Sequence, residues 1–135
     1  NRLTGAIGEK EIGRQNIERL SRNNISKINN SLKLLFSKGL AVDERVDRLL
    51  NGNERLNGGG IGFVSTMLFL KDSKNFNIFN EGVLKGLRIV FPDAEKATNG
   101  TSYVFFNELV MRFKVKFALN DEEVDNILWN VGRSY

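Results

Sequence analysis

Apolar side chains recur along most of this chain at intervals of three and four residues, the spacing that places them on one face of an α-helix. The pattern is clearest between Asn23-Asn24 and Gly39, because Asn favours the start of a helix and Gly favours its end. The apolar positions of that segment are Ile25, Ile28, Leu32, Leu35 and Phe36. They predict a helix with one buried face.

Six further segments predict helices, so we expect a compact all-α domain of about seven helices. They cover residues 9–20, 43–50, 61–70, 81–90, 106–117 and 120–131. Gly13 weakens the first of them, Asn80 is a suitable N-cap for the fourth, and Pro92 prevents that helix from continuing. Asn120 and Glu123 resemble a capping box at the start of the last helix.

The periodicity also predicts which side chains are buried. In residues 43–50, Val46, Leu49 and Leu50 face inward, and this leaves Arg45 and Arg48 free. The wide apolar surface of residues 61–70 indicates a central helix. Residues 76–79 predict an extended connector whose aromatic side chains cover the core.

Residues 103–106 and 113–117 have strand character as well, but the spacing from Phe106 to Phe117 fits a helix better and no pairing partner is evident. We expect the phenylalanines at positions 105, 106, 113 and 117 to belong to the core. Trp129 lies off the apolar stripe of the last helix. It either packs against the first helices, which we favour, or offers a stacking surface.

The composition excludes several kinds of catalyst. The chain has 135 residues, enough for one domain, and contains no Cys and no His. Disulfides, thiolate nucleophiles, zinc fingers and imidazole bases are therefore excluded. We expect no cofactor and no metal, because the consecutive carboxylates at residues 121–125 suit a helix N-terminus better than a metal cage.

No apolar run approaches membrane-spanning length, and the lack of Cys fits a cytoplasmic protein. Because the chain begins at Asn1 instead of Met, we interpret it as a fragment of a larger protein. We treat residues 1–135 as a single domain.

The net charge of +4 is modest, but it is unevenly distributed. Residues 1–57 contain 11 Lys and Arg against 7 Asp and Glu, whereas residues 101–135 contain 4 against 5. An anionic partner that meets the first half explains this excess, and so does an ordinary solvated surface.

The densest turn signal is at residues 56–62, which read Leu-Asn-Gly-Gly-Gly-Ile-Gly and precede an apolar run. Glycines permit a close approach of the backbone, and the first N–H groups of a helix lack intrahelical partners. Such a helix start is suited to a phosphate group. Nucleic acid is therefore the first partner to consider.

Gly60-Ile61-Gly62, with Thr66 four residues later, resembles the hairpin of helix-hairpin-helix DNA-binding domains. The resemblance implies that the N–H groups of the hairpin hold a DNA phosphate, that Ile61 anchors the hairpin, and that Thr66 lies where the two helices pack.

Helix-hairpin-helix base-excision glycosylases are similar over a further segment, but their catalytic groups are missing here. At residues 79–83 their catalytic aspartate is replaced by Asn80, and the position used for a catalytic lysine is Val64. An amide has no charge with which to stabilise a cation or activate a nucleophile. Glu81, next to Asn80, is the remaining carboxylate, and its simplest role is in the first turn of a helix.

A second resemblance covers residues 20–132. The segments 20–24, 42–50, 60–68, 76–80 and 124–129 look like a helical domain of prokaryotic restriction and defence proteins, found beside McrB-type AAA+ motors and HNH nucleases. This implies a DNA-recognition module.

We therefore predict a non-catalytic module that binds duplex DNA. N–H groups of the glycine run would capture phosphates, and basic residues would support them. The predicted DNA-binding residues are Arg45, Arg48, Arg55, Asn57, Gly58, Gly59, Gly60, Gly62, Lys71 and Lys74. The alternatives are a protein-interaction module that recruits a partner through Trp129 or apolar helix faces, and a divergent DNA glycosylase that uses Glu81.

Overall fold

The computed structural model describes residues 12–134, which contain seven complete α-helices and no β-strand. The all-α architecture is therefore confirmed for these residues. The helices are α2 (Arg14–Ser21), α3 (Ile25–Leu35), α4 (Val42–Asn51), α5 (Ile61–Lys71), α6 (Glu81–Val90), α7 (Gly100–Phe117) and α8 (Asp121–Ser134).

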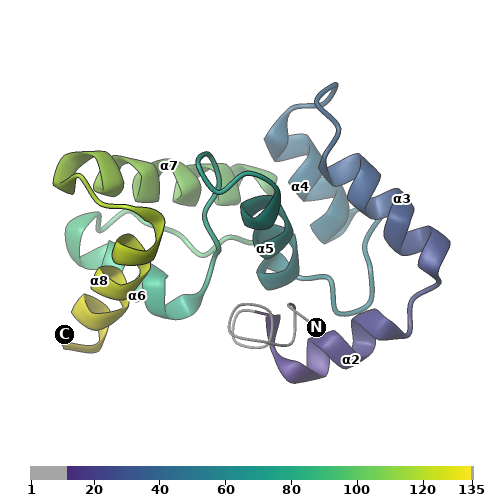
Figure 1. Cartoon of the computed structure of the whole chain (residues 1–135), viewed down its shortest axis with the longest axis horizontal. Helices are drawn as coiled ribbons and strands as arrows, with labels where there is room; N and C mark the ends of the chain where they lie inside the picture. The colour runs from purple at the N-terminus through teal and green to yellow at the C-terminus, as the bar shows by residue number, and fades with distance from the viewer. Residues whose placement is uncertain (1–11, 135) are drawn as a thin grey trace.

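Helix α5 lies near the middle of the molecule, with α3 and α4 on one side and the pair α6 and α8 on the other (Figure 1). The longest helix, α7, joins the two sides because it packs against α4 near its start and contacts α8 near its end. Helix α2 lies below α3 and α5 in this view. None of the described helices is long and apolar enough to cross a membrane.

A single apolar core connects helices α3 to α8. Val46, Leu49 and Leu50 of α4 are all buried, as predicted. The rings of Phe79 and Phe106 meet edge to face, with their centroids 4.9 Å apart. Complete burial of side chains of this size stabilises the fold by roughly 1.5–3 kcal/mol each. The largest fully buried side chains are Tyr103, Phe106, Leu35, Leu49, Leu68, Leu84, Leu87 and Leu128.

The sequence predicts most helix starts correctly because their caps are local. The side chains of Asn24 and Asn80 accept hydrogen bonds from the backbone N–H groups of Ser26 and Val83, each at 2.8 Å. Asn120 and Glu123 exchange two reciprocal bonds of 2.9 Å at the start of α8.

Several helix boundaries differ from the prediction. Helix α3 ends at Leu35, four residues before Gly39, and α8 continues to Ser134. The first predicted segment is interrupted at Gly13, whose φ of +89° lies outside the helical region, so α2 begins at Arg14; residues 9–11 lie outside the described residues. Helix α7 begins at Gly100, six residues earlier than expected, because Asn99 and Ser102 form a capping box. Residues 103–106 and 113–117 are helical, as preferred.

Three apolar side chains are not where the periodicity places them. Ile25 is 72% exposed and Phe117 is 51% exposed, so neither belongs to the core. Phe117 instead packs beside Phe113, with the two rings tilted by 50° and their centroids 4.8 Å apart. Trp129 packs on Gly82 of α6 and not on the first helices.

Helices α6 and α8 approach closely because glycines line their contact. A Cβ at Gly86 would collide with the carbonyl oxygen of Leu128, and a Cβ at Gly82 would collide with the ring of Trp129. A Cβ at Gly132 would lie 2.8 Å from the backbone nitrogen of Gly86. We call Gly82, Gly86 and Gly132 the glycine seam.

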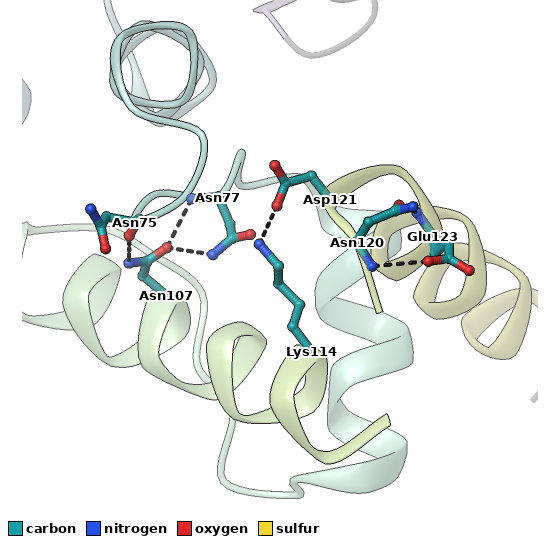
Figure 2. A network of polar contacts seen from close by, with 7 residues as sticks. All are labelled: Asn75, Asn77, Asn107, Lys114, Asn120, Asp121 and Glu123. Atoms are coloured by element: carbon teal, nitrogen blue, oxygen red, sulfur yellow. Dashed lines mark hydrogen bonds and ion pairs between the residues drawn. The ribbon is translucent and has the colours of Figure 1, made fainter. Parts of the chain in front are cut away.

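Residues 76–80, in the connector between α5 and α6, have no regular secondary structure, and Asn107 of α7 holds the connector in place (Figure 2). The Asn107 side-chain oxygen accepts 2.8 Å bonds from the backbone and the side chain of Asn77, and its amide donates to the Asn75 carbonyl at 2.8 Å. The buried Tyr103 hydroxyl donates to the Asn77 carbonyl at 2.9 Å, and burial raises the pKa of that hydroxyl. Residues 75–77 therefore have a fixed position against α7.

Candidate anion-binding surface

The glycine run forms a turn that docks on α2 and on the turn after it. The Asn23 side chain both accepts from the Asn57 backbone N–H, at 3.1 Å, and donates to the Asn57 carbonyl, at 2.9 Å. Gly58 has a φ of +73°, and a Cβ there would collide with the carbonyl oxygen of Asn16. The Gly59 N–H donates to the Leu56 carbonyl at 3.0 Å, which closes the turn. Packing and turn geometry thus explain why positions 58 and 59 are glycines.

Gly60 is placed differently from its two neighbours. It is the N-cap residue of α5, no side chain of the described residues caps the helix there, and a Cβ would meet open space. The intrahelical ladder begins with the bond from the Val64 N–H to the Gly60 carbonyl, at 3.0 Å. Gly62 lies in the first turn, and its carbonyl accepts from the buried Thr66 hydroxyl at 2.6 Å.

The three predicted arginines are engaged within the protein, so the expectation that Arg45 and Arg48 are free is wrong. Arg45 donates to the Leu35 carbonyl at the end of α3, at 2.7 Å. Arg48 lies 3.6 Å from the Glu54 carboxylate. Arg55 donates to the Leu50 carbonyl near the end of α4, at 3.1 Å. Arg45 and Arg55 therefore satisfy helix C-terminal carbonyls, where cations are favourable.

The two predicted lysines lie at the opposite end of α5 from the glycine run. Ten residues separate Ile61 from Lys71, so the two ends of the helix are about 15 Å apart. The Lys71 ammonium lies over the Phe36 ring, 5.6 Å from its centroid. Lys74 is exposed in the turn that follows α5. The predicted residues thus do not form one continuous site.

A pocket of about 420 Å³ lies at this far end of α5. Its lining includes Arg45 and Lys71, which the sequence predicts as DNA-binding residues. It also includes Lys38, which the sequence does not predict. Lys38 can be recognised as a lining residue only in the folded structure, because the short turn between α3 and α4 brings Arg45 back toward the end of α3. The lining residues are Phe36, Lys38, Arg45, Leu68, Lys71, Asp72, Asn75 and Phe76.

The positions that carry catalytic groups in helix-hairpin-helix glycosylases have structural roles here. Asn80 caps α6, and Val64 is completely buried in the core. The Glu81 side chain is 66% exposed and pairs with Lys96 at 3.2 Å. An exposed surface carboxylate of this kind lacks the enclosed setting that tunes a general acid or base.

The acidic run at the start of α8 is also accounted for by local contacts. Asp121 pairs with the buried Lys114 of α7, and Glu123 completes the capping box (Figure 2). Among the described residues, no group of three or more carboxylates is arranged to hold a metal ion.

Comparison with protein families, with curated proteins and with solved structures gave no match to this chain. Residues 52–60 connect α4 to α5, as the loop of a helix-hairpin-helix element would. The assignment of these residues to such an element stays a prediction. Function is therefore inferred from the charges, contacts and pocket described above.

Proposed function

We propose that this domain is a non-catalytic DNA-binding module that contacts the phosphate backbone with the half formed by α2 to α5. The distribution of charge is the observation that carries the proposal. Residues 12–78 contain eleven Lys and Arg against six Asp and Glu, whereas residues 79–134 contain seven against eight. A basic half joined to a nearly neutral half is the electrostatic footprint of a protein that binds a polyanion.

Two places in the basic half supply groups for phosphates. At the start of α5, Gly60 leaves the first N–H groups of the helix without a side-chain cap, and the helix dipole favours an anion there. At the end of α5, Lys71 and Lys74 provide positive charge. Because the two ends are about 15 Å apart, roughly four base-pair steps of B-DNA separate them, and one duplex can contact both.

The resemblance over residues 20–132 to helical domains of restriction and defence proteins supports a cytoplasmic role in such a system. In that role the module would deliver a nuclease or an AAA+ motor to DNA. Asn80 has an amide where glycosylases have a catalytic carboxylate, and Glu81 is exposed. Both observations favour DNA binding over base excision.

The test is a fluorescence titration of a labelled duplex at 50 and 200 mM salt, with the wild-type domain and with Gly60→Asp. Phosphate contacts make the affinity fall with salt, and we expect at least a tenfold loss over this range. Asp is a favoured N-cap, so Gly60→Asp keeps the fold while its carboxylate occupies the N–H groups of α5 and repels phosphate. We expect it to bind at least tenfold more weakly at 50 mM salt.

Asn126→Asp is the matched control, because it adds the same charge on an exposed position of α8, in the other half. It should leave the affinity unchanged. Absence of duplex binding would refute the proposed function. Wild-type affinity in a folded Gly60→Asp domain would refute the role of the α5 start.

A second candidate function is recruitment of a partner protein through the end of α7. Val115 is 79% exposed and Phe117 is 51% exposed, and both lie in the last turn of this helix. Trp129, the other side chain suggested for such contacts, is a weaker candidate because it packs on Gly82. An apolar interface changes little with salt, so the same titration separates the two functions.

A further inference from the structure

The pocket at the end of α5 combines positive charge with an apolar lining. Three cations line it, Lys38, Arg45 and Lys71, against the single carboxylate of Asp72. Its volume of about 420 Å³ lies within the range of roughly 300–1,000 Å³ that is usual for small-ligand sites. A ligand that matches both properties has an anionic group and an apolar or aromatic body.

Two of the cations have contacts within the protein that direct them toward the pocket. The Arg45 guanidinium is anchored by its 2.7 Å bond to the Leu35 carbonyl, and the Lys71 ammonium is held over the Phe36 ring. Arg45 has five N–H donors, of which the bond from Nη1 to the Leu35 carbonyl uses one. The pair therefore retains hydrogen-bond donors for a phosphate, which guanidinium and ammonium groups bind well.

The rest of the lining suits a flat ring. Leu68 is buried at the base, while the rings of Phe36 and Phe76 are half-buried. Nucleic-acid bases stack on such aromatic side chains regardless of their sequence. Asp72 accepts a 2.8 Å bond from the Asn75 amide and keeps further capacity to accept from an amino group on a base.

We propose that this pocket binds a nucleoside monophosphate, with the phosphate on Arg45 and Lys71 and the base against Phe76. A bare phosphate would leave the apolar lining exposed, and an uncharged ring would leave Arg45 and Lys71 without an anion. The ligand is either a free nucleotide or an unstacked nucleotide of a strand. Only the second source rests on the proposed DNA-binding function.

The first experiment is an NMR titration of the full, isotope-labelled chain with each of the four deoxynucleoside monophosphates. We expect the amide signals of residues 36–38 and 68–76 to shift. Deoxycytidine, which lacks the phosphate, and ribose 5-phosphate, which lacks the base, should bind at least tenfold more weakly. Equal binding of ribose 5-phosphate and the nucleotides would overturn the contact with the base.

The variants Lys71→Gln and Phe76→Leu test the two parts of the site. Each should lower nucleotide affinity at least tenfold, because the first removes a fixed charge and the second removes the stacking ring but keeps an apolar side chain. Lys33→Gln, on an exposed position of α3 outside the pocket, should bind like the wild type. Unchanged binding by both pocket variants would overturn the assignment of the site.

A second titration separates the two sources of the nucleotide. If a strand supplies it, a duplex with one unpaired nucleotide should bind at least tenfold more tightly than a fully paired duplex, and Phe76→Leu should abolish the difference. Nucleotide binding without any DNA binding would support a free nucleotide and refute the proposed function. Salt-dependent duplex binding without any nucleotide binding would leave the proposed function standing and overturn this inference.

Discussion

Gly58 and Gly60 lie two residues apart in one loop, yet different constraints act on them. Gly58 has a positive φ and no room for a side chain, whereas Gly60 has extended backbone angles and open space around it. The same residue type thus serves tight packing at one position and leaves a helix start open at the other. In the sequence the two positions look equivalent, because the contact of Gly58 with α2 is a tertiary one.

Gly58→Ala should destabilise the domain, because the new Cβ collides with the Asn16 carbonyl and a φ of +73° strains any L side chain. The cost of a non-glycine residue in this conformation is about 1–3 kcal/mol. Urea denaturation followed by circular dichroism measures it. Gly60→Ala, at a position with open space, should cost less, about 0.5–1 kcal/mol, because Ala is a weaker N-cap than Gly. Equal stability of the two variants would contradict the tight packing of Gly58 on α2.

At the scale of elements, the sequence predicts a helix well where the helix carries its own signals. Helices α3, α6 and α8 begin where Asn24, Asn80 and Asn120 cap them. The sequence predicts the start of α7 six residues too late, because the apolar pattern that indicates this helix begins at Phe106. In the structure Gly100 is the first residue of α7, and this position needs a glycine because a Cβ would collide with the Asp43 carbonyl of α4.

Gly86→Ala should separate helices α6 and α8, because the added Cβ meets the backbone of α8 at Leu128 and not a flexible side chain. Overpacking of this kind costs about 1–3 kcal/mol, and backbone contact places the loss toward the upper end. Gly39→Ala is the control, because its Cβ would make only an ordinary contact of 3.8 Å with the Ser37 hydroxyl oxygen. Thermal unfolding compares the two variants, and a Gly86→Ala domain as stable as Gly39→Ala would show that the glycine seam tolerates a side chain.

At the scale of the whole molecule, the candidate site could be predicted only in part. The sequence predicts Arg45 and Lys71 as binding residues from their charge and position. Lys38, Phe36 and Phe76 are recognised as lining residues only when three elements fold together. The sequence also could not reveal that arginines nominated for DNA contact satisfy helix carbonyls, since those carbonyls belong to residues five to ten positions away. The uneven charge, in contrast, is a property of the sequence itself.

The stability of the domain at alkaline pH should depend on Tyr103, which links α7 to the connector. Burial raises the pKa of the Tyr103 hydroxyl above the value of roughly 10 that it has in the unfolded chain. The folded state therefore binds this proton more tightly, and its contribution to stability is complete below about pH 10 and is lost as the pH rises above it.

Tyr103→Phe should lower the free energy of unfolding at pH 7 by about 1 kcal/mol, because the bond to the Asn77 carbonyl is lost. Between about pH 9 and 11 its stability should fall less steeply than that of the wild type, as no buried hydroxyl is left to ionise. Urea denaturation at pH 7, 9 and 10.5 measures both effects. Parallel losses in the two proteins would contradict a role of the Tyr103 hydroxyl in the alkaline loss of stability.

The network around Asn107 also holds residues that line the pocket at the end of α5. Phe76 forms part of the pocket wall, and the residues before and after it, Asn75 and Asn77, are both bonded to Asn107 (Figure 2). This part of the wall is therefore ordered when the protein folds. Its conformational entropy is not lost again on binding, so ordering it does not weaken the affinity for a ligand. A wall that is rigid in advance favours a ligand whose shape already fits it, so affinity is gained without a rearrangement of the protein.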